Sequence, residues 1–256
     1  MNSINDKDIV KKQYENSNNL NLRISIHDKY SFNKQGFGNW IFENYNILPN
    51  ANILELGCGT ANMWNKKDDI INKCNSIVLS DLSLGMIETA KNNIKSDKID
   101  FRVIDIQNIP YEDNSFDIVI ANMMLYHVPD LNKALSEVKR VLKSNGVFYC
   151  ATYGENGIMN YLSKILGFID NTNKNFTLQN GNSILKKHFN KVEMLEYKDH
   201  LEVSNVNDLI DYIYSLSSMS NLNMMDKDKM YKILNDNMVD GIINIPKEYG
   251  MFIAKK

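Results

Sequence analysis

The sequence predicts an α/β fold built on a doubly wound, mostly parallel sheet. From residue 50 onward, short runs rich in Val, Ile and Leu alternate with amphipathic stretches of helical period, and the first apolar run ends in a glycine-rich segment. Strands that alternate with helices in this way form parallel sheets covered on both faces. The length of 256 residues fits one large domain or one domain with an insertion.

The elements follow in order. Helical spacing of apolar residues indicates two N-terminal helices, at 6–14 and 37–45. Strands are expected at 52–56, 76–81, 101–105, 116–121 and 147–152. Ser83 is a suitable N-cap for a helix that reaches residue 94. The clearest apolar stripe runs over 131–142, and Ser144-Asn145-Gly146 is expected to end that helix.

The C-terminal part has a looser pattern. A helix is expected over 158–166, and a pair of strands at 192–197 and 251–254. Two amphipathic stretches between these strands predict a helical insertion at about 204–244, which is longer than most connections and typical of a lid or specificity element. We therefore expect a helical cap over residues 1–48 and a second domain over residues 49–256 that carries the insertion.

The first strand leads into the segment that carries chemistry. Gly57 and Gly59 allow a sharp turn and close approach to a ligand, and Asp81 ends the second strand, where a carboxylate can bind both hydroxyls of a ribose. A nicotinamide enzyme of Rossmann type would have a third glycine where Asn62 stands. In such an enzyme the carboxylate of Glu55 would also lie next to the negatively charged pyrophosphate, which is unfavourable. A ligand that has an amino group and no phosphate suits this carboxylate better.

Four motifs over residues 50–152 resemble those of the class I methyltransferases that use S-adenosylmethionine, in particular the methyltransferase type 11/25 group. They are ILELGCGT at 53–60, VLSDLS at 78–83, DIQNIP with NSFD at 105–117, and LKSNG at 142–146. The chain departs from the family pattern at Ala61, where a third glycine is common, and at Ser144-Asn145, where Pro-Gly is usual. The resemblance implies a Rossmann-like seven-stranded sheet, mostly parallel, with an antiparallel last strand.

The same resemblance implies the roles of the cofactor-binding residues. Glu55 and the backbone of Gly57, Cys58 and Gly59 would hold the methionine part, Asp81 the ribose, Leu82 and Asp105 the adenine, and the Ile106 amide the adenine ring. Each polar side chain also has a structural alternative. Glu55 could be a strand-end charge, Asp81 a helix N-terminal acid and Asp105 a turn former.

The segment 122–129 after the fourth strand is expected to face the transferred methyl group, with Asn122 in contact with the cofactor. His127 is the candidate base, because its proton affinity suits neutral pH. The alternative is that His127 caps the next helix or packs structurally. Transfer from a sulfonium also proceeds by positioning alone when the nucleophile has no proton to lose.

A second candidate surface lies near the N-terminus. Arg23, His27 and Tyr30 are spaced to share one face of a helix. As a flap over the cofactor, this helix could offer Arg23 to a carboxylate and Tyr30 to the sulfonium or adenine. The alternative is an ordinary solvated helix face.

Composition restricts the partners. A net charge of −2 provides no general attraction to nucleic acid, which favours a small-molecule acceptor. No apolar stretch is long enough to span a membrane. The three cysteines are an odd number without paired spacing, which argues against a disulfide framework and a zinc site and predicts a cytoplasmic protein. We expect a monomer or homodimer that acts as a methyltransferase. The alternatives are a non-catalytic S-adenosylmethionine-binding protein and a nicotinamide-dependent oxidoreductase.

Overall fold

A single mixed sheet organises the part of the chain that the computed structural model describes, residues 18–216 and 220–256. Its seven strands follow the order β3-β2-β1-β4-β5-β7-β6. They are β1 (Asn52–Leu56), β2 (Ser76–Asp81), β3 (Ile99–Val103), β4 (Phe116–Ile120), β5 (Leu142–Tyr153), β6 (Lys191–Val203) and β7 (Ile243–Lys255). The first five pair in parallel, and β7 runs antiparallel to both β5 and β6. The predicted fold class is confirmed.

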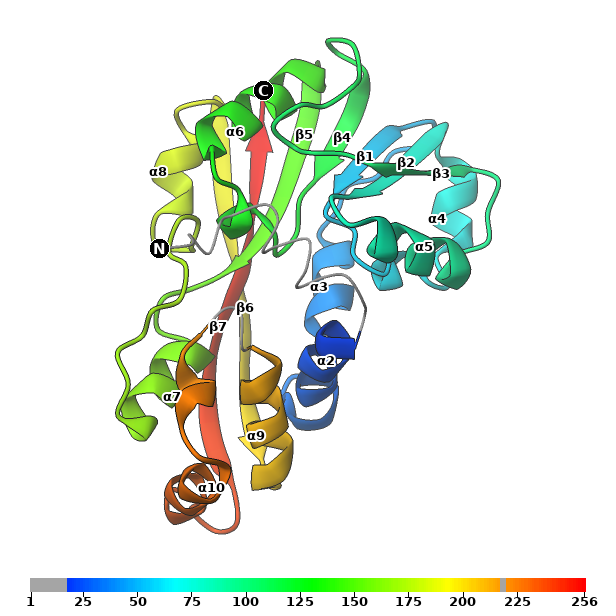
Figure 1. Cartoon of the computed structure of the whole chain (residues 1–256). Helices are drawn as coiled ribbons and strands as arrows, with labels where there is room; N and C mark the ends of the chain where they lie inside the picture. Colours follow the sequence, from blue (N-terminus) through cyan, green and yellow to red (C-terminus); the bar gives the residue numbers. More distant parts are fainter. Residues whose placement is uncertain (1–17, 217–219) are drawn as a thin grey trace.

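Helices cover both faces of this sheet (Figure 1). They are α2 (Asn18–Tyr30), α3 (Phe37–Glu43), α4 (Asp68–Lys73), α5 (Leu84–Asn93), α6 (Leu131–Val141), α7 (Ile158–Leu166), α8 (Gly181–Leu185), α9 (Val206–Ser215) and α10 (Lys227–Asp236). Three 3₁₀ turns complete the set: η1 (Asn62–Trp64), η2 (Leu125–His127) and η3 (Leu222–Met224). One apolar cluster joins α6 and α8 to the sheet, and another joins α3, α4 and α5 to the opposite face. None of these described helices is long and apolar enough to cross a membrane.

Local sequence signals account for several helix boundaries. The Ser83 hydroxyl accepts a hydrogen bond from the Met86 amide at the start of α5, as expected from its N-cap position. Asp130 does the same for α6 by accepting from the Lys133 amide. The last residue of α7 is followed by Gly167, whose positive φ of 72° closes the helix in the usual left-handed conformation.

Other expectations need correction. The third strand ends at Val103 rather than at 105, so Asp105 lies in the turn that follows. Residues 144–146 belong to β5, which starts directly after α6. β5 pairs with β4 at Leu142 and again from Val147 onward, and the register shifts between these two pairs, so the expected turn is an irregular stretch within the strand. The short helices α4 and α8 were not expected. The helix expected at 6–14 lies outside the described residues.

The last two strands are much longer than the sequence suggests. β6 and β7 have 13 residues each and remain paired from Lys191↔Lys255 to Val203↔Ile243. Figure 1 shows them continuing out of the sheet, with α7, α9 and α10 around their far part. A third apolar cluster, which includes Leu162, Leu209 and Leu234, fills the space between these helices and the strands. We call the far part of β6 and β7, together with α7, α9 and α10, the distal lobe.

Candidate cofactor and acceptor site

The loop after β1 begins with two glycines that both need a left-handed backbone. Gly57 has a φ of 75° and Gly59 a φ of 55°. A Cβ on Gly57 would also lie 2.9 Å from the Cγ of Met124, which comes from the segment after β4. Ala61 adopts the same region with a φ of 59°, which explains why a glycine is common at this position. Both the backbone conformation and the nearby Met124 side chain thus favour glycine at position 57.

Glu55 is a buried carboxylate at the carboxyl end of β1, with 3% of its surface exposed. The indole Nε1 of Trp64 donates a hydrogen bond to it. Burial raises the pKa of Glu55 to about 7, the Trp64 hydrogen bond acts in the opposite direction, and the charge of Asp81 adds to the rise. A ligand ammonium placed here would favour the ionised form.

Asp81 connects the glycine loop to the next strand. One carboxylate oxygen accepts from the Gly59 amide at 3.0 Å, and the other accepts from the Ser83 amide at 2.9 Å. Burial raises the pKa of Asp81, while these backbone donors lower it. Each carboxylate oxygen can accept a second hydrogen bond, so a ribose diol remains compatible with this arrangement.

The turn after β3 forms the next wall. Asp105 Oδ1 accepts from the Gln107 amide at 3.0 Å, which is the turn-forming role considered for this residue. The Gln107 side chain in turn accepts from the Asp130 amide at 3.1 Å, which ties the turn to the start of α6. Ile106 is buried, and Leu82 is half-buried after β2. The predicted adenine contacts therefore lie on the turns after β2 and β3.

Asn122 follows β4 and bridges three elements. Its Nδ2 donates to the Tyr45 hydroxyl at 2.6 Å, and its Oδ1 accepts from the Ala151 amide at 3.1 Å. These bonds fix the start of the segment 122–129 between β5 and the end of α3. The expected contact of Asn122 with a cofactor stays a prediction.

Comparisons with known proteins agree with this arrangement. The family model described as a methyltransferase domain matches residues 54–150. A ubiquinone/menaquinone biosynthesis C-methyltransferase of Rickettsia typhi is 32% identical over 184 residues, 64% of this chain and 71% of that protein. A demethylmenaquinone methyltransferase of Staphylococcus saprophyticus is 28% identical over 143 residues, 55% of this chain, which spans 58% of that protein's length.

The chain belongs to the class I S-adenosylmethionine-dependent methyltransferases. The fold agrees with this family. Phosphoethanolamine N-methyltransferase 2 of Haemonchus contortus, solved in complex with S-adenosyl-L-methionine, has a TM-score of 0.61 and 17% identity, with 100% of this chain and 60% of that chain covered. At this identity the likeness concerns the fold alone.

The donor set of the methyltransferase fits its family's cofactor. The buried carboxylate of Glu55 suits the ammonium of S-adenosylmethionine, and the glycine loop suits the chain that bears the sulfonium. The carboxylate of Asp81 suits the ribose. By contrast, the glycine loop leads into η1, a turn of three residues, rather than into a helix whose N-terminus could hold a pyrophosphate. The residues present thus suit S-adenosylmethionine better than a dinucleotide.

In the turn η2 after β4, the candidate base His127 is buried, with 8% of its surface exposed. Burial and, to a lesser extent, the positive charge of Arg23 lower the pKa of His127 to about 4. Asp130 is the N-cap of α6, so His127 does not have the capping role considered for it. At neutral pH its imidazole is uncharged.

Arg23, His27 and Tyr30, the three residues of α2 that were predicted to form a flap, have different surroundings. The His27 ring lies against Tyr249 of β7 and Tyr212 of α9, with its Nε2 at 3.4 Å from the Tyr249 hydroxyl. The charge of Arg23 influences the pKa of both tyrosines and of His127, and the expected contact of Arg23 with the cofactor stays a prediction. The Tyr30 hydroxyl donates to Asp208 of α9 at 2.6 Å. That bond ties α2 to the distal lobe, and a contact of Tyr30 with the cofactor stays a prediction.

The turn between α2 and α3 is held by a buried ion pair. Lys247 Nζ lies 2.7 Å from Asp199 Oδ2, and both side chains are almost fully buried. The same ammonium donates to the Ser31 hydroxyl at 3.0 Å, and Asp199 accepts from the Asn33 amide at 2.9 Å. These contacts fix the position of both N-terminal helices against β6 and β7.

Sequence reasoning missed several of these groups. Trp64 and Tyr45 are aromatic residues at helical positions, which usually signals packing rather than contact with a site carboxylate or amide. The folded chain brings Trp64 to Glu55 and Tyr45 to Asn122. An open hollow of about 620 Å³ lies instead at the amino ends of β1–β3, away from the edge where parallel sheets bind ligands.

Proposed function

We propose that this chain transfers the methyl group of S-adenosylmethionine to a small-molecule acceptor. The observation that carries the proposal is the set of Glu55, the Gly57–Gly59 backbone and Asp81 at neighbouring carboxyl ends of β1 and β2. Glu55 would bind the cofactor's ammonium, Asp81 its ribose, and the turns with Leu82, Asp105 and Ile106 its adenine. When bound, the cofactor supplies an electrophilic methyl group, and the protein's task is to position the acceptor in line with it.

The acceptor would lie between α2 and the segment 122–129, with Arg23 and His127 nearby. At a pKa of about 4, His127 is a weak base. Taking a proton from a hydroxyl of pKa near 10 would be unfavourable by about 8 kcal/mol. An acceptor that is a neutral nucleophile, or that arrives ionised, therefore suits this site better than one that His127 must deprotonate.

The names of the two relatives guide the choice of acceptor. Both are quinone-pathway methyltransferases, so a hydroquinone, methylated at carbon, is the first acceptor to assay. An amine and a thiol of similar size form the comparison. The non-catalytic alternative predicts cofactor binding without transfer to any of the three.

Calorimetry tests the proposal. Titration with S-adenosylmethionine and S-adenosylhomocysteine should give binding, and titration with NAD should give none. Labelled methyl transfer to the acceptors is measured next. Binding without transfer to any acceptor would favour the non-catalytic alternative, and binding of NAD alone would overturn the proposal.

A further inference from the structure

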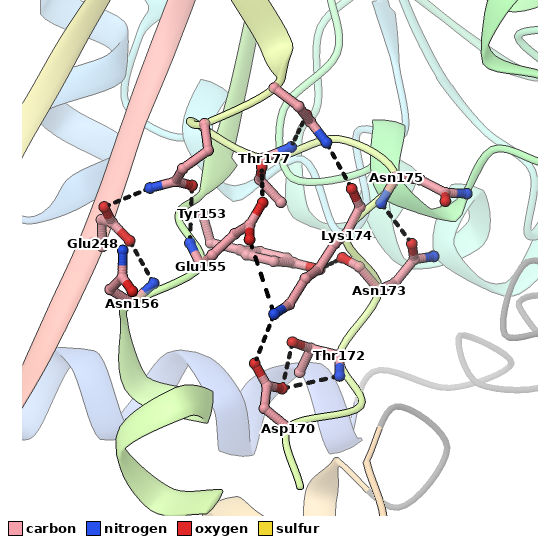
Figure 2. Close-up of polar contacts among 12 residues, drawn as sticks. Tyr153, Glu155, Asn156, Asp170, Thr172, Asn173, Lys174, Asn175, Thr177 and Glu248 are labelled. Carbon is pink, nitrogen blue, oxygen red and sulfur yellow. Dashed lines mark hydrogen bonds and ion pairs between the residues drawn. The ribbon is translucent and has the colours of Figure 1, made fainter. Parts of the chain in front are cut away.

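The connection between α7 and α8 runs past the acceptor side of the molecule. We call residues 167–180 the strap. Its C-terminal part is firmly anchored, because Phe176 and Thr177 are fully buried and the Thr152 hydroxyl donates to the Phe176 carbonyl at 2.9 Å. Figure 2 shows polar side chains of the strap beside Tyr153 and Glu155, at and after the end of β5, and not far from Glu248 of β7.

Two carboxylates hold the strap in place, one in the turn after β5 and one in β7. Glu155 accepts from the Thr177 hydroxyl at 3.0 Å and lies 3.9 Å from the Lys174 ammonium (Figure 2). Glu248 of β7 accepts from the Gln179 side chain at 2.7 Å. The strap is thus attached along its C-terminal half, from Lys174 to Gln179.

Asn173 lies in the middle of the strap and reaches two other segments. Its backbone carbonyl accepts from the Tyr153 hydroxyl at 2.5 Å, as Figure 2 shows. Its side-chain amide donates to the backbone carbonyl of Tyr126. The rings of Tyr126 and Tyr153 are 4.7 Å apart, so the three residues close a triangle between the strap, the end of β5 and η2.

The corner at η2 matters because His127 follows directly. The Tyr126 and His127 rings are in contact, with centroids 4.5 Å apart, and the His127 amide donates to the Met124 carbonyl within the turn. Met124 in turn lies over Gly57 of the cofactor loop. A displacement of this turn would therefore move both the candidate acceptor wall and the side chain above the glycine loop.

We propose that Asn173 is a positioning residue that holds η2, and with it His127 and Met124, in the geometry that receives the acceptor. The role rests on the proposed function, since it assigns η2 to the acceptor wall. Asn173 acts through the Tyr126 carbonyl and does not itself touch the reacting atoms. The strap thereby couples the distal part of the chain, through α7, to the site.

The test compares Asn173→Ala with Asn175→Ala. Both remove one amide from the strap, but Asn175 is exposed, and its contact with Asn173 uses the backbone N–H, which the substitution keeps. Hydrogen exchange of segment 122–129 should become about tenfold faster in Asn173→Ala, as expected for the loss of one buried hydrogen bond. It should stay unchanged in Asn175→Ala, and exchange in β1 and β2 should stay unchanged in both variants.

A second readout follows the His127 imidazole by NMR. In the unaltered protein it should titrate with a pKa of about 4, and in Asn173→Ala the pKa should rise toward the ordinary value of 6.5 as the ring gains solvent. Arg23, whose charge also acts on His127, is unaltered in both variants. Unchanged exchange at 122–129 and an unchanged His127 titration would overturn the proposal.

A third variant covers the case in which Asn173→Ala fails to fold. Tyr153→Phe removes only the hydroxyl that binds the Asn173 carbonyl, and it should give the same changes in exchange and titration with smaller amplitude. No change in this variant would overturn the proposal. These readouts need neither cofactor nor acceptor, so their outcome does not depend on the calorimetric test of the proposed function. Absent cofactor binding would remove the proposed function while leaving the mechanical role of Asn173 measurable.

Discussion

At the scale of single residues, the two site carboxylates have different surroundings. Asp81 is held by two backbone amides, so it shapes the glycine loop, and we propose that it also binds the cofactor's ribose. Asp81→Ala should weaken S-adenosylhomocysteine binding at least tenfold, because charge-assisted hydrogen bonds to the ligand and to Gly59 are lost together. Calorimetry measures this, with the exposed Asp69→Ala as the matched control. Equal affinities in both variants would contradict the assignment.

Glu55 gives a prediction about protons. Its pKa of about 7 means that it is mostly protonated at pH 6. Binding of a ligand ammonium stabilises the carboxylate, so cofactor binding should release about 0.9 proton at pH 6 and about 0.1 at pH 8. Calorimetry in buffers of different ionisation enthalpy measures the release. The Glu55→Gln variant should release none at either pH, and a release that does not change with pH would count against this role.

The raised pKa of Glu55 also determines how the stability of the folded protein changes with pH. The folded ligand-free protein binds the Glu55 proton more tightly than the unfolded chain does, between pH 4.5 and about 7. The contribution of Glu55 is therefore most favourable below pH 4.5 and is lost as pH rises through 7. In Glu55→Gln this part of the pH dependence should disappear.

At the scale of elements, the turn between α2 and α3 depends on the Lys247–Asp199 pair. Lys247→Met should lower the free energy of unfolding by about 3–5 kcal/mol, since it leaves the carboxylate of Asp199 buried without its partner. The double variant Lys247→Met/Asp199→Leu should recover much of the loss. Urea denaturation compares the two. A double variant no more stable than the single one would show that the pair's burial is not the cause.

The elements also differ in how well the sequence predicts them. The glycine loop, Asp81 and the starts of α5 and α6 are predictable because local chemistry determines them: positive φ, N-capping and apolar period. The extent of β6 and β7 is not, because their distal halves are stabilised by cross-strand pairing with each other and by packing against α9 and α10. Asn173 is unpredictable for the same reason, as its partners Tyr126 and Tyr153 are distant in sequence. Trp64 lies only nine residues from Glu55, but no sequence pattern indicates that its indole donates to that carboxylate.

At the scale of the whole molecule, three apolar clusters share continuous strands. The two tryptophans, Trp40 and Trp64, both lie by the cluster under α3. Leu234→Ala in the distal lobe should cost about 2–5 kcal/mol, because Leu234 is fully buried. If the lobe and sheet unfold together, tryptophan fluorescence and circular dichroism will report the same lowered midpoint. A fluorescence midpoint that stays at its original value would show that the lobe unfolds separately.

The uninterrupted β6–β7 ladder has a consequence for how such a molecule can change over evolutionary time. A residue inserted within either strand would shift its register and turn every later side chain to the opposite face. Residues inserted between Val203 and Ile243, where α9 and α10 lie, leave the ladder intact. The segment that joins the two strands can therefore diverge in length and sequence while the strands that carry Glu55 and Asp81 stay as they are.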